Sequence, residues 1–147
     1  MLIENVTLND KIIAIILRND FSEPGVTFVT SHDFSQQLAI IKHPTGKIIQ
    51  PHLHNQVHRE VNFTQEVLLI KKGRLRVDFY DDDKKYLESK ELEAGDVILL
   101  ALVGHGFEVL EDIEMIEVKQ GPYVEHEDKV RFEGISTNQV IVKKAEE

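Results

Sequence analysis

The feature that most constrains the fold is the two-residue alternation of side chains between residues 74 and 80. Leu75, Val77 and Phe79 alternate with charged residues, the pattern of a β-strand with one buried face. Similar short β-rich runs recur along the chain: 12–17, 25–30, 38–42, 47–50, 65–71, 86–92, 97–100, 107–110 and 113–119. Turn residues separate the runs, with turns predicted at residues 72–73, 81–85 and 111–112. No window of about twelve residues favours a helix, so the sequence predicts an all-β sandwich or barrel.

Length and composition bound the class of protein. With 147 residues, 41% of them hydrophobic, the chain can form one domain with a core of its own. Its longest apolar run is shorter than the roughly 18 residues that span a bilayer, and no signal-peptide cleavage pattern follows it. We therefore expect a cytoplasmic location and no membrane partner. The formal net charge of −9 argues against nucleic acid as a partner, because that binding depends on Lys and Arg.

The absence of cysteine restricts the chemistry that the chain can carry. It excludes disulfides, thiolate nucleophiles and cysteine-ligated metal centres. Any metal ion must therefore be held by nitrogen and oxygen atoms.

Histidine is concentrated in the stretch PHLHNQVHRE, residues 51–60, which holds three of the seven histidines. In a strand, residues two apart point the same way, so His52 and His54 project from one face, about 6.5–7 Å apart. This spacing suits two nitrogen ligands of one metal ion. Pro51 lacks an N–H, so a strand here begins at Pro51 or lies at a sheet edge. The remaining histidines outside the candidate site, His32, His43 and His126, are interpreted as surface residues.

Two further residues have the character of site residues. Glu66 is the only acid in the run 65–70, and a carboxylate heading an apolar strand is costly unless it is paired, ligates a metal or lies at the rim. His105 lies between Gly104 and Gly106, and glycine leaves room beside the imidazole.

These spacings resemble the first motif of the cupin superfamily, G(X)5HXH(X)3–4E(X)6G. Gly46 is followed by five residues and then by His52 and His54, and Glu66 is followed by six residues and then by Gly73. The second motif, G(X)5PXG(X)2H(X)3N, is matched more loosely.

In that second motif Gly95 provides the start, but Ala101 stands at the proline position. His105 arrives one residue early, and the final Asn is missing. The resemblance covers residues 38–121.

The resemblance implies a single cupin domain over residues 1–147, folded as an all-β, cupin-like barrel or double-stranded β-helix (jelly roll). It implies a divalent metal bound inside the barrel by His52, His54, Glu66 and His105. Three imidazoles and one carboxylate suit a transition metal, namely Fe, Mn, Co, Ni, Cu or Zn. Small cupins commonly pair through N-terminal strands, so a homodimer is also implied, with the residues before the core motif supplying the edge.

The segment between His54 and Glu66 departs from the motif, because it holds eleven residues where the family has three or four. Either a hairpin loop is lengthened and Glu66 remains the ligand, or His58 or Glu60 replaces it. The family-like run EVLLIKKGRLRV favours Glu66. Within the insertion, His58 as a general base and Arg59 as a clamp for a carboxylate or phosphate are the candidate catalytic residues.

Two functions agree with this ligand set. The first is a metal-dependent enzyme that acts on a small oxygen-rich metabolite by isomerase, epimerase or dioxygenase chemistry. The metabolite would be a sugar, a sugar nucleotide or a carboxylic acid. The stretch GHGFEVLED is similar to cupins of sugar-nucleotide and surface-polysaccharide pathways, which favours sugar chemistry. The second function is a non-catalytic module that binds a small molecule or a metal without turnover.

Overall fold

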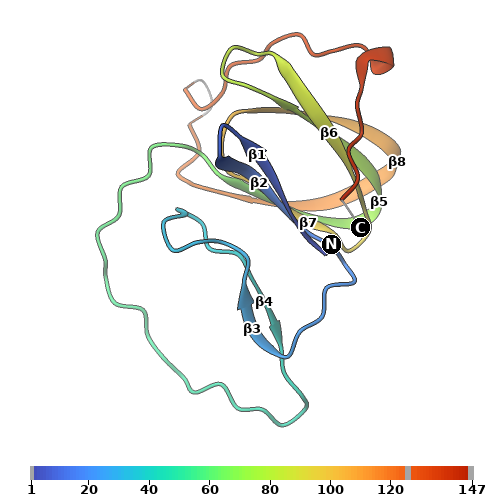
Figure 1. Ribbon diagram of the computed structural model, residues 1–147. Helices are drawn as coiled ribbons and strands as arrows, with labels where there is room; N and C mark the ends of the chain where they lie inside the picture. The colour runs from blue at the N-terminus through green and yellow to red at the C-terminus, as the bar shows by residue number, and fades with distance from the viewer. Residues whose placement is uncertain (1, 125–126, 146–147) are drawn as a thin grey trace.

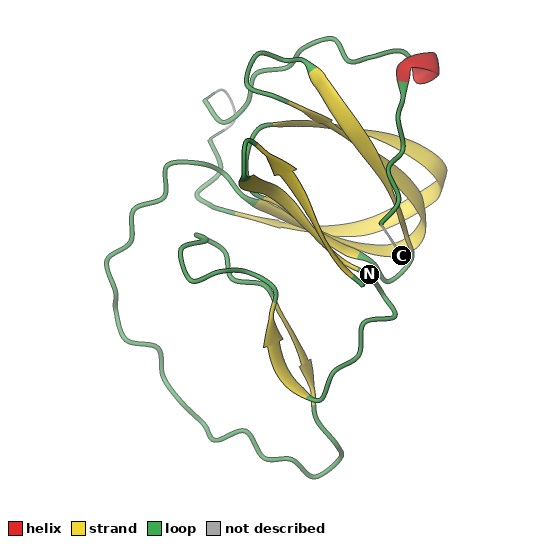
Figure 2. Cartoon of the chain, viewed as in Figure 1, coloured by secondary structure: helices red, strands yellow, loops and turns green. Residues whose placement is uncertain are grey.

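The computed structural model describes residues 2–124 and 127–145. These residues form eight β-strands and one turn of 3-10 helix, η1 (Thr137–Gln139), with no α-helix among them (Figure 2). The strands are β1 (Ile3–Leu8), β2 (Lys11–Leu17), β3 (Gly25–Phe28), β4 (Ala39–Lys42), β5 (Glu66–Tyr80), β6 (Tyr86–Glu93), β7 (Val97–Leu100) and β8 (Gly104–Lys119). The predicted all-β class is therefore confirmed. In the described part of the chain, no helix has the length and hydropathy needed to cross a membrane.

Six strands form one antiparallel sheet in the order β1-β2-β7-β5-β6, with β8 on the other edge of β5. The long strand β5 organises this sheet, because its residues 66–69 pair with β7 and its residues 74–80 pair with β6. β8 runs beside β5 along almost its whole length. The result is a curled sheet that resembles half of a barrel (Figure 1).

The side of β5 that faces the core switches halfway along the strand. Leu68 and Ile70 are buried in the core in the first half, and Leu75, Val77 and Phe79 are buried in the second half. The switch coincides with shifts in the β5–β8 register between Ile70 and Leu75. An irregularity of this kind turns all later side chains to the opposite face.

The turns predicted at residues 72–73 and 111–112 are wrong, because each pair lies inside a continuous strand. The two pairs face each other in the β5–β8 ladder, where the register shifts. Gly73 has a φ of +87°, and a Cβ at this position would lie 2.1 Å from the carbonyl oxygen of Asp112. Glycine is therefore required there for a bend within the ladder, and not for a hairpin.

The first strand, β1, lies outside the predicted runs. It pairs with β2 through a two-residue turn at Asn9 and Asp10, whose φ angles are 51° and 63°. Positive φ at both central residues is the type I′ geometry, which matches the twist of a hairpin and which Asn and Asp tolerate.

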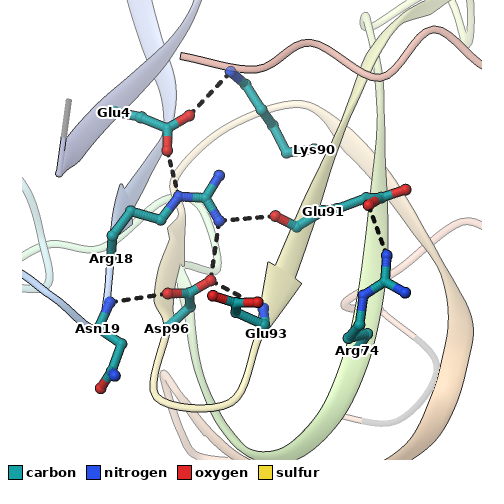
Figure 3. Close-up of polar contacts among 8 residues, drawn as sticks. All are labelled: Glu4, Arg18, Asn19, Arg74, Lys90, Glu91, Glu93 and Asp96. Carbon is teal, nitrogen blue, oxygen red and sulfur yellow. Dashed lines mark hydrogen bonds and ion pairs between the residues drawn. The ribbon is translucent and has the colours of Figure 1, made fainter. Parts of the chain in front are cut away.

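A buried ion network joins the two ends of the β1-to-β6 path (Figure 3). Glu4 of β1 accepts hydrogen bonds from Arg18 and, at 3.2 Å, from Lys90 Nζ of β6. Arg18 also donates to Asp96 Oδ2 at 2.9 Å and to the carbonyl oxygen of Glu91 at 2.8 Å. Burial alone would raise the pKa of Glu4, but Arg18 and Lys90 lower it below its ordinary value. The network therefore ties β1 to β6 and holds the curl.

β3 and β4 form a separate two-stranded sheet. Residues 43–65 follow without helix or strand and are called the arm here. Residues 43–63 are all exposed, and Figure 1 shows the arm as a wide loop that swings away from both sheets. The strand predicted at residues 47–50, and a strand across His52 and His54, are therefore wrong. A β-rich run forms a strand only where a neighbour supplies the ladder hydrogen bonds.

Candidate functional site

Glu66 and His105, two of the predicted ligands, come together in space. Glu66 begins β5 opposite Leu100 of β7, and a short link, residues 101–103, leads from β7 to His105 near the start of β8. Glu66 Oε2 lies 3.5 Å from His105 Nε2, and the two side chains are 13% and 25% exposed. The hydrogen bond with His105 holds the pKa of Glu66 below its ordinary value, although burial opposes this shift. Glu66 is therefore paired, which is one of the three situations expected for a carboxylate at the head of an apolar strand.

The link before His105 is tightly constrained. Val103 has a φ of +64°, a left-handed conformation that is costly for a β-branched residue. A Cβ at Gly104 would lie 3.2 Å from the ring of Phe132 and from the Cβ of Tyr80. Glycine at position 104 is thus explained by close packing against the rest of the protein as well as by the neighbouring imidazole.

The Glu66–His105 pair borders a cavity of about 840 Å³. β5, β8, the link between β7 and β8, the end of the arm and the C-terminal segment around Phe132 all contribute to its walls. The ring of Phe107 lies 5.3 Å from the imidazole of His105, centroid to centroid, and forms part of the wall. Cavities of this size hold small metabolites.

Arg76 and Asp78 also line this cavity, and sequence reasoning missed them. The alternation along β5 predicts one buried face, yet these two residues on the opposite face are only 7% and 6% exposed. Arg76 Nε and Nη2 donate to the two carboxylate oxygens of Asp78 at 2.8 and 3.0 Å, and Arg76 also pairs with Glu108 of β8. Hydrogen bonding to Asp78 raises the pKa of Arg76. The guanidinium is therefore fixed and its charge is balanced.

The C-terminal segment covers this second face of β5. The ring of Tyr80 lies 5.1 Å from that of Phe132, and its hydroxyl accepts a hydrogen bond from the Ile135 N–H at 3.1 Å. Because the covering segment is distant in sequence, the alternation of residues within β5 does not indicate that this face is buried. The one available signal is the opposite charge of Arg76 and Asp78, two residues apart on one face of a strand.

The other two predicted ligands, His52 and His54, lie in the exposed arm. Their ring centroids are 5.2 Å apart, and His52 Nδ1 lies 3.0 Å from the carbonyl oxygen of Gln50. Leu53 between them is 94% exposed. Within residues 2–124 and 127–145, no three His, Asp or Glu side chains form a group that could hold a metal ion. The four predicted ligands are thus divided into two pairs.

The candidate catalytic residues lie in the arm as well. The side chains of His58 and Glu60 are 87% and 82% exposed, with His58 Nε2 4.0 Å from Glu60 Oε1. Arg59 borders a different cavity of about 540 Å³, beside β3 and the residues that follow it. Neither His58 nor Arg59 is among the described residues that line the cavity at Glu66. His32 and His43 are exposed, as predicted, and His126 lies outside the described residues.

The separation of Glu66 and His105 can be compared with that of two ligands of one metal ion. With metal–ligand bonds of roughly 2.0–2.2 Å, two ligands at a tetrahedral ion lie about 3.4 Å apart, close to the 3.5 Å between Glu66 Oε2 and His105 Nε2. The chemistry of this donor set suits a transition metal better than magnesium or calcium. Among the described residues, His52 and His54 do not join Glu66 and His105 in a group of three or more potential ligands.

Comparison of the chain with protein-family models, with curated proteins and with solved structures found no match. The cupin resemblance therefore remains a prediction that rests on the motif spacings of the sequence.

Proposed function

We propose that this protein is a metal-dependent cupin that binds a small oxygen-rich metabolite in the cavity beside Glu66 and His105. The observation that carries the proposal is the 3.5 Å contact between these two side chains at the border of a cavity of about 840 Å³. Half-buried carboxylate–imidazole pairs with a shifted pKa are concentrated at functional sites. The contact with His105 lowers the pKa of Glu66 and so favours the ionised carboxylate, the form in which it can bind a metal.

Glu66 and His105 would hold the divalent transition metal, and His52 and His54 of an arm that lies over the cavity, from the same chain or from a second copy, would complete its shell. When bound, such an ion supplies Lewis-acid or redox chemistry to oxygen atoms of a metabolite. An arm in that position would also bring His58 and Arg59 to the cavity. There the His58 imidazole can accept a proton, and the Arg59 guanidinium can bind an anionic group of the metabolite.

The charges that line the cavity favour a sugar-like ligand. The deep guanidinium of Arg76 is balanced by Asp78 and Glu108, so it offers no free positive charge to a carboxylic acid. Exposed Lys129 and Arg131 also line the cavity, together with the acids Glu117 and Asp128, and their cationic groups can meet a phosphate. A ligand that is rich in hydroxyl groups and carries one anionic group suits this distribution of charged side chains. We therefore propose a sugar or a sugar nucleotide, with isomerase or epimerase chemistry ahead of dioxygenase chemistry.

The second candidate is a non-catalytic module that binds the same kind of ligand. It is favoured by the position of His58 and Arg59, which stand in the exposed arm and not at the cavity. A module needs only the cavity and the Glu66–His105 pair, whereas an enzyme needs a group placed for proton transfer.

Metal loading of single variants tests the ligand assignment. Metal content per chain, measured after dialysis against Mn²⁺, Fe²⁺ or Zn²⁺, should fall at least about tenfold in Glu66→Gln and His105→Ala. His43→Ala, which removes an exposed histidine from the same arm, should load normally. If Glu66→Gln loads fully while His58→Ala does not, Glu66 is not the ligand.

Incubation of the metal-loaded protein with a panel of sugars and sugar nucleotides separates the two functions. Proton NMR of the panel should show one compound converted to an isomer or epimer. Saturable binding without conversion would favour the module, and neither binding nor conversion would contradict both functions.

A further inference from the structure

The arm carries apolar side chains that a solitary chain leaves in water. It runs through residues 43–65 without helix or strand, which exceeds the roughly 12–15 residues usual for an unstructured loop within a compact domain. Its large apolar residues are all substantially exposed: Ile48 82%, Ile49 61%, Leu53 94%, Val57 56%, Val61 46% and Phe63 68%. An exposed apolar segment of this length is typical of an interaction surface.

β8 offers a surface of matching chemistry. Among the described residues it pairs only with β5, so one edge of a 16-residue strand has unpaired main-chain groups. The strand also exposes apolar side chains: Phe107 41%, Val109 52%, Ile116 49% and Val118 55%. A long, apolar, unpaired edge is a template for another strand.

The charges of the two surfaces are complementary. The arm has two basic residues, Lys47 and Arg59, and one acid, Glu60, together with four histidines. β8 contains five acids, namely Glu108, Glu111, Asp112, Glu114 and Glu117, and one lysine, Lys119. Basic residues of β5 pair with three of these acids, Glu108, Glu111 and Glu114, and partly balance their charge. Two chains of net charge −9 repel each other in general. The slightly positive arm against the acids of β8 therefore meets less repulsion than most other contacts between two copies.

Both ends of the arm are held by its own subunit. On one side Lys42 belongs to β4, paired with Gly25 of β3. On the other side the Gln65 N–H donates to the Gln120 side chain, and the Thr64 hydroxyl donates to Asp128. The middle of the arm swings away from its own sheets between these fixed ends (Figure 1). This geometry presents the arm outwards, towards a second molecule.

We propose that two copies of this chain exchange arms, and that each arm adds along the free edge of β8 in the other copy. The two arm–β8 contacts are equivalent, and together they cover the apolar surfaces of the arm and of β8 in both copies. The assembly is therefore closed as a symmetric dimer. In a part of the proposal that rests on the proposed function, each exchanged arm places His52 and His54 beside the partner copy's Glu66 and His105 pair. The metal shell that one chain leaves divided is completed between two chains.

Disulfide trapping tests the exchange, since the chain has no cysteine of its own. One chain would carry both Leu53→Cys and Val109→Cys, and it would be oxidised without metal and in the presence of a chelator. Exchange predicts a covalent dimer on a non-reducing gel. The same experiment with Leu53→Cys and Val26→Cys is the control, because Val26 is 51% exposed but lies on β3. A monomer with an internal disulfide would show that the arm docks on its own subunit and would overturn the proposal.

A mixture of two single-cysteine chains provides a second, independent version of this test. Leu53→Cys and Val109→Cys chains of different size should form a mixed disulfide dimer at a yield at least about tenfold above that of Leu53→Cys with Val26→Cys. An equal yield for the two combinations would contradict a specific contact between the arm and β8.

Oligomeric state separates arm exchange from pairing through the N-terminal strands. Light scattering with size exclusion should find a dimer for the unchanged chain. It should find a dissociation constant raised at least about tenfold for Ile49→Asp with Leu53→Asp. Leu2→Asp, beside β1, should leave the dimer intact. A monomeric unchanged chain, or a dimer that only Leu2→Asp dissociates, would overturn the proposal.

Metal content of the same samples keeps the two proposals apart. If the dimer trapped by Leu53→Cys with Val109→Cys binds no metal once the chelator is replaced by Mn²⁺, Fe²⁺ or Zn²⁺, arm exchange is supported and the metal function is contradicted. Full metal loading of a monomeric Ile49→Asp with Leu53→Asp variant would contradict assembly of the shell between two chains and leave the metal function standing.

Discussion

Replacement of Glu4 by Gln tests whether the ion network holds the curled sheet together. The Glu4 side chain is 5% exposed and that of Lys90 is 8% exposed, so the substitution removes a charge from a buried pair without changing its volume. Loss of one partner of a buried pair costs about 3–5 kcal/mol. Arg18 keeps its bonds to Asp96 and to the carbonyl oxygen of Glu91. Arg18 loses the Glu4 carboxylate but still pairs with Asp96, whereas the Lys90 ion pair with Glu4 is lost without such a replacement, so we expect the low end, about 3 kcal/mol.

Urea unfolding followed by circular dichroism measures this loss, with the slope of the transition compared between the two proteins. The matched control is Glu93→Gln, because Glu93 is an exposed acid at the end of the same strand, β6. Its free energy of unfolding should stay within about 0.5 kcal/mol of the unchanged protein. A loss below about 0.5 kcal/mol for Glu4→Gln would refute the reasoning that the network stabilises the curl.

Three further predictions concern β5 and the site. Gly73→Ala should cost more than about 2 kcal/mol, because φ is +87° and the new Cβ would meet a carbonyl oxygen at 2.1 Å. Gly46→Ala, at φ +88° but with open space around the new Cβ, should cost only about 1 kcal/mol. Equal urea midpoints for Gly73→Ala and Gly46→Ala would contradict this difference. The lowered pKa of Glu66 implies stability that is complete above its ordinary pKa of 4.5 and is lost as the pH falls through the folded-state pKa. The melting temperature of the unchanged protein should therefore fall more steeply with decreasing pH than that of Glu66→Gln. Parallel plots of melting temperature against pH for the two proteins would count against the Glu66–His105 pair. Tyr80→Phe should cost about 1 kcal/mol and speed hydrogen exchange at Ile135, whereas unchanged exchange would contradict the 3.1 Å hydrogen bond.

Local pattern predicts much of the fold because strand formation leaves a period in the sequence. The runs at residues 12–17, 86–92 and 97–100 correspond closely to β2, β6 and β7. The continuity of β5 and β8 is not predictable in this way. From the sequence alone, Gly73 indicates a turn both where a hairpin closes and where a strand only bends within a ladder. Only the pairing of two distant strands decides between the two.

The candidate site shows the same division between local and distant information. The cost of an unpaired carboxylate at the head of a strand predicts a partner for Glu66, and His105 is that partner. The burial of Arg76 depends on the C-terminal segment, which the period of β5 does not record. The position of His52 and His54 depends on whether a neighbour pairs with the arm, and no run of residues specifies that neighbour.

Electron spin echo spectroscopy of the full chain loaded with Cu²⁺ tests the metal-site proposal most directly, because it counts imidazole ligands at the ion. We predict one ion per chain with imidazole coupling, and a weaker coupling in His105→Ala, which removes the imidazole beside Glu66. His43→Ala, an exposed histidine of the arm, should give the unchanged spectrum. Absence of bound copper at about one ion per chain, or a His105→Ala spectrum identical to that of the unchanged protein, would contradict the proposal that Glu66 and His105 form the centre of a metal site.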